Sequence, residues 1–201
     1  GYGDSDVYGG TAIEIRTTSR SENASHLRRV EINNNNINGG GYTNSNFGSL
    51  DQGINLYGSD VSEDQIVIKD NEVRNVRNRA LYLNNIPNGR CSNNTLKSNY
   101  TNQGSYNPDD TWNSSSVVTL DHIGSGFTFA GNVIDSSYVS GIRSESSSAI
   151  VDSNTITNHM QSIYVRAYIE NPTVLTVRYN NLTNNEYRGI KFTEWGNAVV
   201  N

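Results

Sequence analysis

The feature that most constrains the fold is an internal repeat of two alternating apolar patterns. The first reads apolar-x-apolar-x-x-Asn-x-apolar, where x is any residue. It occurs at VEINNNNI (30–37), IVIKDNEV (66–73), GRCSNNTL (89–96), FTFAGNVI (127–134), AIVDSNTI (149–156) and LTVRYNNL (175–182). The second, small-apolar-x-apolar, occurs at AIEI (12–15), GINL (53–56), ALYL (80–83), VVTL (117–120), GIRS (141–144), SIYV (162–165) and GIKF (189–192). Repetition of this kind indicates a stack of similar structural units.

Alternation of apolar and polar residues is typical of β-strands, whose side chains point to opposite faces in turn. One full cycle takes about 22 residues, contains no helical segment and has few hairpin turns of the Asn-Gly type. Parallel strands wound in successive coils, each pairing with the next at about 4.8 Å, fit this pattern. The sequence therefore predicts an all-β fold, a right-handed parallel β-helix (solenoid) of about seven coils.

One asparagine keeps its place in every occurrence of the first pattern. At a bend between strands, a side-chain amide donates to the coil on one side and accepts from the other, and each such hydrogen bond contributes about 1 kcal/mol net. Asparagine also tolerates the left-handed backbone conformation that a tight corner needs. We therefore predict an interior ladder of structural asparagines. Its members are Asn35, Asn71, Asn94, Asn132, Asn154 and Asn180.

Composition narrows the class of protein. Only 34% of the residues are hydrophobic, but their periodic arrangement favours a single folded domain over residues 1–201 rather than disorder. The net charge of −5 argues against a nucleic-acid partner, and no run of 18 apolar residues is present to span a membrane. The single cysteine, Cys91, excludes an internal disulfide framework and a cysteine-based zinc site, and it is expected to be buried.

The repeat resembles the pectate-lyase-like β-helix superfamily, whose right-handed repeats are shared by polysaccharide lyases, mannuronan C5-epimerases and phage tailspike depolymerases. The resemblance covers residues 11–201 and rests on core and ladder positions, so it is specific for the fold more than for function. It implies a domain that binds and degrades polysaccharide, as a lyase or a glycoside hydrolase, on the outside of a cell or on a virion. It implies no required cofactor, with calcium as a candidate ligand.

Solenoids need capping units with a polar outer face, and neither end of this sequence reads as one. We therefore expect the domain to be a fragment of a longer chain or to be closed by neighbouring chains. Phage spikes of this superfold are typically trimers, so the resemblance implies a homo-oligomer, with a trimer as the expected form.

The residues between the core positions of the second pattern should point outward and align from coil to coil. They are aromatic, basic and acidic, unlike the Ser, Thr and Asn elsewhere. The first expected row is Glu14, Asn55, Tyr82, Thr119, Arg143, Tyr164 and Lys191. The row two residues further on is Arg16, Tyr57, Asn84, Asp121, Glu145, Arg166 and Thr193.

Long insertions flank the same predicted face. Residues 38–52 and 97–116 leave one corner of the coils, and residues 16–29 and 57–65 leave the opposite corner. Long loops in a compact fold are usually functional. Loops on both sides of a flat sheet would form a groove that suits a sugar chain.

Glycoside hydrolysis requires two carboxyl groups beside the scissile bond. Asp121 and Glu145 fall on neighbouring coils, and Asp109 and Asp110 on a long loop are alternatives. The competing interpretation is structural, with Glu145 simply pairing with Arg166 one coil away.

Elimination by a lyase instead requires a cation for the uronate carboxylate and a base for the C5 proton. Arg143, Arg166 or Lys191 could supply the cation. Tyr82, Tyr164 or His122 could supply the base, although the side chains of Asp121 and His122 would diverge on a regular strand. The competing interpretation is a solvated ladder of charges without catalytic function.

The predicted catalytic set is therefore Tyr82, Asp121, Arg143 and Glu145. The predicted contacts to substrate are Tyr57, Trp112, Tyr164, Arg166, Lys191, Asp109 and Asp110. The alternative function is a non-catalytic spike, adhesin or scaffold, which would leave this face flat and solvated.

Two further comparisons give weaker hypotheses. Uronan C5-epimerases carry Tyr-Gly-x-Asp-Pro-His, and this chain matches it at Tyr57, Gly58 and Asp60 but has Val61 and Ser62 in place of the Pro and His. Acidic segments at 62–65 and 107–110 are candidates for calcium, but their spacing is not diagnostic of a metal site.

Overall fold

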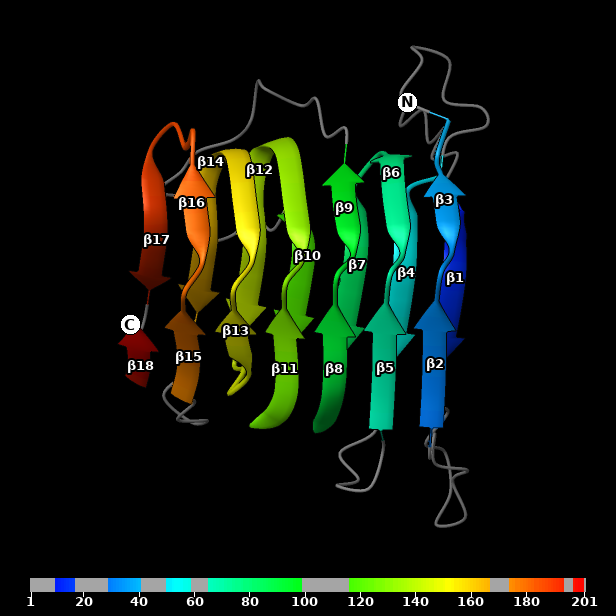
Figure 1. Ribbon diagram of the computed structural model, residues 1–201, viewed down its shortest axis with the longest axis horizontal. Helices are drawn as coiled ribbons and strands as arrows, with labels where there is room; N and C mark the ends of the chain where they lie inside the picture. Colours follow the sequence, from blue (N-terminus) through cyan, green and yellow to red (C-terminus); the bar gives the residue numbers. More distant parts are fainter. Residues whose placement is uncertain are drawn as a thin grey trace, which may run out of the picture.

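The computed structural model describes residues 10–16, 29–40, 50–58, 65–98, 116–166, 174–193 and 197–200. Within these ranges every regular element is a β-strand, with no helix, and all strand pairs are parallel. The strands stack side by side along the long axis of the molecule (Figure 1).

Seven strands form one sheet, here called the seven-stranded sheet. Its strands contain the first half of each first pattern, and successive strands pair in register. In chain order they are β2 (Arg29–Asn33), β5 (Gln65–Lys69), β8 (Asn88–Ser92), β11 (Gly126–Ala130), β13 (Ile150–Asp152), β15 (Val174–Arg178) and β18 (Asn197–Val200).

The other eleven strands form a bent sheet with two walls. The short wall follows the ladder asparagines. It consists of β3 (Asn36–Asn38), β6 (Glu72–Val76), β9 (Thr95–Ser98), β16 (Asn181–Thr183) and the first parts of β12 (Val133–Glu145) and β14 (Thr155–Arg166). The long wall contains the second pattern. It consists of β1 (Thr11–Arg16), β4 (Gln52–Tyr57), β7 (Arg79–Asn84), β10 (Ser116–Asp121), β17 (Arg188–Thr193) and the last parts of β12 and β14.

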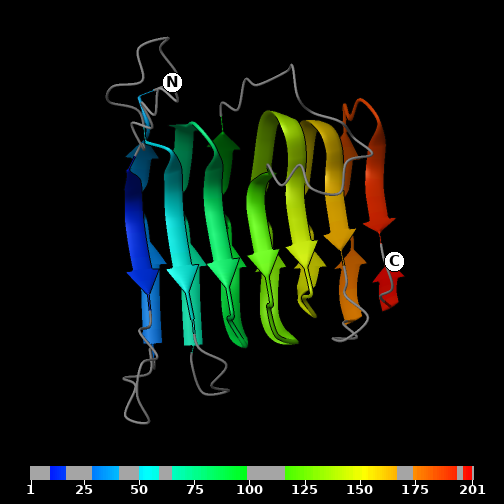
Figure 2. The ribbon, with the colours of Figure 1, turned by 180° about the vertical axis from the view of Figure 1, so that it is seen from behind.

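The chain visits the seven-stranded sheet, the short wall and the long wall in turn and then repeats the circuit. For example, β2, β3 and β4 are followed by β5, β6 and β7, each lying beside its counterpart. Figure 2 shows the long-wall strands from behind, in chain order from blue at the left to red at the right. The predicted all-β architecture of parallel strands is confirmed, and its winding is consistent with a parallel β-solenoid.

The apolar residues of both patterns face the interior and align from coil to coil. The two largest fully buried side chains, Phe127 and Phe129, lie on β11 in the middle of the stack. Cys91 is buried and free, as predicted. One aligned core row of the long wall is Ile13, Ile54, Leu81, Val118, Ile142, Ile163 and Ile190. Such rows give each coil an apolar surface that only its neighbours cover.

The predicted asparagine ladder is present at the corner between the seven-stranded sheet and the short wall. The side-chain Nδ2 of each asparagine donates to Oδ1 of the next, at 2.8–3.0 Å. The backbone N–H of each also donates to that same Oδ1, at 2.9–3.0 Å. Asn71, Asn94, Asn132 and Asn154 are buried, so these bonds satisfy amides that water cannot reach.

The prediction that the ladder asparagines adopt the left-handed backbone conformation is wrong. The ladder residues do not adopt the left-handed backbone conformation; the residue before each of them does. These preceding residues are Asn34, Asp70, Asn93, Gly131, Ser153 and Tyr179, with φ between 53° and 66°. The left-handed residue turns the chain, and the following asparagine is selected for its amide alone.

Two strands are much longer than the repeat predicts. β12 and β14 pass from the short wall into the long wall without interruption, and their pairing shifts register between Ser137 and Ser140. A bulge bends a strand while keeping its ladder on both sides. In these two coils the bend therefore replaces a loop, whereas β9 and β10 are separate strands.

A candidate active site on the long wall

The strand register shows that both rows predicted for the long wall align from coil to coil. Along the first row, Glu14 pairs with Asn55, then come Tyr82, Thr119, Arg143, Tyr164 and Lys191. Along the second, Arg16 pairs with Tyr57, then come Asn84, Asp121, Glu145, Arg166 and Thr193. The long wall thus carries acidic, basic and aromatic residues on adjacent strands.

Polar groups converge most closely on the carboxylate of Asp121, the last residue of β10. Its Oδ2 accepts the hydroxyl of Tyr82 at 3.1 Å and the amide of Asn84 at 2.8 Å. Its Oδ1 lies 2.6 Å from Nδ1 of His122. The side chain of Asp121 is 18% exposed, whereas that of His122 is 47% exposed. Asp121 is thus held by three neighbours, while the imidazole remains open to a ligand.

The expectation that Asp121 and His122 diverge is wrong. His122 does not continue the strand, because it has a φ of 54° and forms the turn that follows β10. A left-handed residue at this point breaks the strand alternation and brings the imidazole back beside the preceding carboxylate. The resulting His–Asp pair is the arrangement that fixes the tautomer of a histidine base.

Tyr82 lies at the centre of an aromatic and cationic cluster. Its ring meets Tyr57 edge to face, with centroids 5.2 Å apart, and the guanidinium of Arg79 lies 5.1 Å from its centroid. Burial raises the pKa of the Tyr82 hydroxyl, and the charge of Asp121 and the hydrogen bond to it raise that pKa further. The raised pKa favours the neutral phenol, which donates its hydrogen bond to Asp121.

Glu145 lies beside Asp121 on the adjacent strand. Its observed ion pair is with Arg143, two residues earlier on β12, and not with Arg166 as in the competing structural interpretation. The guanidinium of Arg143 also lies 5.2 Å from the ring of Tyr164, and Lys191 approaches the same ring at 5.5 Å. Arg143, Tyr164 and Lys191 thus pack on one another along the first row.

Part of the predicted face is not solvent-exposed. Arg143, Tyr164 and Arg166 are only 4%, 3% and 7% exposed, although strand alternation turns all three outward. Arg143 is thus engaged with Glu145 and Tyr164 rather than open to a substrate. The cation role predicted for Arg143 and Arg166, and the sugar contact predicted for Tyr164, are not supported by this packing.

Several predicted residues cannot be placed in the site. Trp112, Asp109 and Asp110 lie outside the described residues, as do the central parts of the insertions that were expected to form a groove. Of the calcium candidates, only Gln65 belongs to the described part of the chain. Among the residues that the structure describes, no group of three or more His, Cys, Asp and Glu side chains is arranged to hold a metal ion.

The roles of three residues in the site were not predicted from the sequence. Asn84 belongs to the expected second row, but its bond to Asp121 depends on side-chain geometry. Arg79 begins β7, where regular alternation from Tyr82 would place it on the inner face. The turn at His122 was not predicted, because left-handed residues are uncommon even for histidine, although histidine is enriched among them.

Comparison of the chain with protein-family models, curated proteins and solved structures found no match. The described residues form an all-β stack of parallel strands with a His–Asp–Tyr cluster on one wall. None of the described segments forms a helix long and apolar enough to cross a membrane.

Proposed function

We propose that the chain is a right-handed, pectate-lyase-like β-helix domain that binds and cleaves an acidic polysaccharide. The observation that carries the proposal is the contact of His122 and Tyr82 with one carboxylate, that of Asp121. The right-handed winding is supported by the strong preference of parallel strand connections for that hand.

His122 acts as the base. With the Nδ1 proton donated to Asp121, Nε2 carries a lone pair and is free to accept a proton from substrate. The Asp121 carboxylate stabilises the imidazolium that forms and keeps the ring oriented. Acid–base groups placed in this way typically accelerate a reaction by about 10²–10⁴-fold.

Tyr82 acts as the acid in a β-elimination. Nε2 of His122 takes the C5 proton of a uronate unit, the released electron pair forms the C4–C5 double bond, and the C4–O bond breaks. The leaving oxygen receives the proton of the Tyr82 hydroxyl, which burial and Asp121 keep protonated. One proton is taken and one is given, so the step balances with no external reactant.

Elimination fits the observed contacts better than hydrolysis does. A glycosidase needs one protonated carboxyl group as its acid. Asp121 instead accepts hydrogen bonds from Tyr82 and Asn84, and Glu145 pairs with Arg143, so neither carboxyl group is presented to a glycosidic oxygen as a proton donor. Hydrolysis by Asp121 and Glu145 therefore ranks second.

The test is incubation with polygalacturonate, alginate and bacterial capsular polysaccharides, following ultraviolet absorbance of unsaturated ends. We expect His122→Gln to lower turnover by about 10²-fold or more with the fold intact by circular dichroism. Thr155→Ala on the short wall is the matched control and should leave turnover unchanged. New reducing ends without unsaturation would replace elimination by hydrolysis, and full activity of His122→Gln would refute the assignment of the base.

A non-catalytic glycan-binding spike or scaffold is the second candidate. It is favoured by the burial of Arg143, Tyr164 and Arg166, which packs much of the outward rows into the structure. In that case no polysaccharide of the panel would yield product.

A uronan C5-epimerase is the weaker alternative. In that reaction His122 and Tyr82 would remove and return the C5 proton from opposite sides of the sugar. Inversion at C5, followed by nuclear magnetic resonance of the polymer, would appear without chain cleavage.

The resemblance supplies the remaining parts of the proposal. It implies an extracellular or virion-surface location, a homo-oligomer such as a trimer or continuation of the chain, and calcium as a ligand rather than a required cofactor. Sedimentation of the chain with and without calcium tests the oligomeric state and its dependence on calcium.

A further inference from the structure

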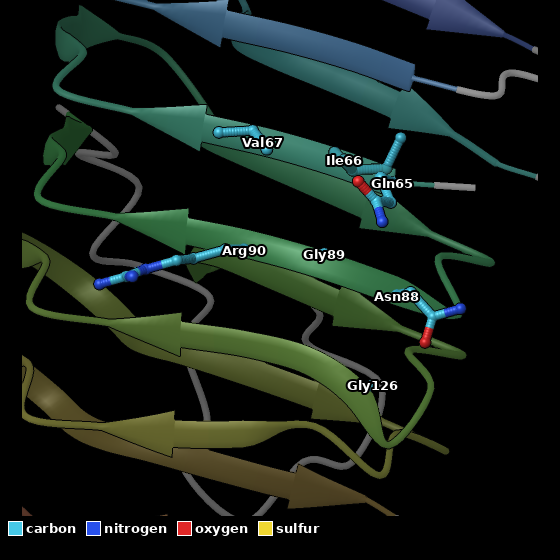
Figure 3. Close-up of a pocket in the computed structure, with 7 residues that line it drawn as sticks. All are labelled: Gln65, Ile66, Val67, Asn88, Gly89, Arg90 and Gly126. Carbon is cyan, nitrogen blue, oxygen red and sulfur yellow. The ribbon is translucent and has the colours of Figure 1, made fainter. Parts of the chain in front are cut away.

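A hollow of about 580 Å³ lies on the outer face of the seven-stranded sheet, across β5, β8 and β11. Its size falls within the range of about 300–1,000 Å³ that is usual for small-ligand sites. Figure 3 shows the amides of Gln65 and Asn88 at one end and the Arg90 side chain at the other. The lining residues are Gln65, Ile66, Val67, Asn88, Gly89, Arg90 and Gly126.

Two glycines leave the floor of this hollow as bare backbone. Gly89 has a φ of 140°, and a Cβ there would lie 2.3 Å from the carbonyl oxygen of Ile66. A Cβ at Gly126 would lie 1.8 Å from Oδ1 of Asn88, so the amide of Asn88 lies over this glycine. The close backbone of Ile66 is one reason for glycine at position 89, and the lack of side chains at both positions leaves backbone that a ligand can approach.

The hollow also contains a cation, the guanidinium of Arg90, that pairs with no carboxylate of the described residues. On the described part of this sheet Arg29 pairs with Glu31 and Arg178 pairs with Asp152. Arg90 makes no ion pair with any described residue, and its neighbours in register are the uncharged Val67 and Thr128. An exposed guanidinium between uncharged neighbours is suited to bind a planar oxyanion through two parallel hydrogen bonds.

We propose that this hollow is a second saccharide-binding site, which takes a sugar unit bearing a carboxylate or sulfate group. Arg90 binds the oxyanion, the amides of Gln65 and Asn88 bind hydroxyl groups, and the sugar ring lies over Gly89 and Gly126. Charge complementarity selects the ligand: a neutral sugar gives Arg90 no partner.

This site is separate from the Asp121 cluster. β5, β8 and β11 face the viewer in Figure 1, whereas β7 and β10 lie behind them and face the viewer in Figure 2. A ligand in the hollow therefore does not contact His122 or Tyr82, and the proposal stands whether or not the long wall is catalytic.

The test is titration of the ¹⁵N-labelled chain with three saccharides of matched length: oligogalacturonate, dextran sulfate and neutral dextran. The amide signals of Gly89 and Gly126 report this site alone. We expect them to shift with one or both charged saccharides, and the two arms distinguish carboxylate from sulfate. Neutral dextran should bind at least about 10-fold more weakly, the scale of one charge-assisted hydrogen bond.

Arg90→Gln should weaken the binding of the charged saccharide at least about 10-fold while His122→Gln leaves it unchanged. Arg178→Gln removes the same charge from β15 of the same sheet and serves as the control. The proposal is overturned if neither glycine amide shifts with a charged saccharide, if neutral dextran binds equally well, or if Arg90→Gln binds like the parent.

Discussion

At the scale of the residue, two consecutive residues have different structural roles at the corner of each coil. The first residue takes the left-handed conformation, and the second supplies the amide of the ladder. The first position is therefore chemically permissive and even holds Tyr179. The second position is asparagine at all six described corners, because it must donate and accept along the same line.

Substitution of a central ladder residue should be strongly destabilising. In Asn132→Ala, the backbone N–H and side-chain amide of Asn94 lose their acceptor, and the carbonyl of Cys91 loses a donor. Buried groups left unpaired cost about 1–3 kcal/mol each, so we expect a loss of about 3–5 kcal/mol in the free energy of unfolding.

Asn35→Ala is the matched control for urea denaturation. Asn35 is half-buried and accepts no hydrogen bond from a preceding ladder asparagine among the described residues, so its loss should be about 1 kcal/mol. Equal losses at the two positions would show that the ladder does not act through buried amides.

At the scale of the element, neighbouring strands of the short wall are linked by a polar network around Asp135 of β12. Its carboxylate contacts Lys97 of β9 at 3.2 Å and accepts from Thr157 and Asn158 of β14 at 3.1 and 2.7 Å. Partial burial alone would raise the pKa of Asp135, but the hydrogen bonds from Asn158, Lys97 and Thr157 outweigh it and lower that pKa.

The lowered pKa of Asp135 predicts a dependence of stability on pH. Its contribution is complete above the unfolded-state pKa of about 3.9 and is lost as the pH falls through the lower pKa of the folded state. Below about pH 4 the free energy of unfolding of the parent should therefore fall more steeply than that of Asp135→Asn. Denaturation by urea across that range measures both slopes, and parallel slopes would contradict the prediction.

Among the strands, the register of the long wall was predictable from the sequence, but the length of β12 and β14 was not. The strand register of the long wall was predictable from the two-residue alternation of apolar and polar residues alone. A shift of one residue would expose Ile54 and Leu81 to solvent. The continuity of β12 and β14 did not follow, because a bulge is a change of backbone path with no residue type of its own. The burial of Arg143 was missed for a similar reason: alternation gives a side chain's direction but not its neighbours.

The candidate site was predictable only in part. Tyr82, Asp121 and Glu145 were placed on neighbouring strands by the repeat, and the structure places them there. The role of His122 depends on one backbone dihedral angle, and that angle is set by the path of the chain around the corner rather than by the residue itself.

At the scale of the whole molecule, each coil contacts only its neighbours, so stability should vary along the stack. Core residues of β7, β10 and the last part of β12 are fully buried, whereas those of β1 and β17 are only partly buried. Solenoids behave as linear arrays of coupled repeats, and their outer repeats open most readily.

Amide hydrogen exchange should therefore follow position along the stack. We expect protection to be highest at Leu81, Val118 and Ile142 and to fall toward Ile13 and Ile190, as measured on the 201-residue chain by nuclear magnetic resonance. Uniform protection across all coils would instead indicate a single cooperative unit.

The asparagine ladder also gives the stack a direction. Each ladder asparagine from Asn35 to Asn154 donates its Nδ2 to the asparagine of the coil with the higher residue number, so the side-chain hydrogen bonds of the ladder all run in one direction. The array presents acceptors at one end and donors at the other. Another coil, or a second copy of the chain, can extend the ladder only head to tail, because two like ends would place acceptor against acceptor or donor against donor.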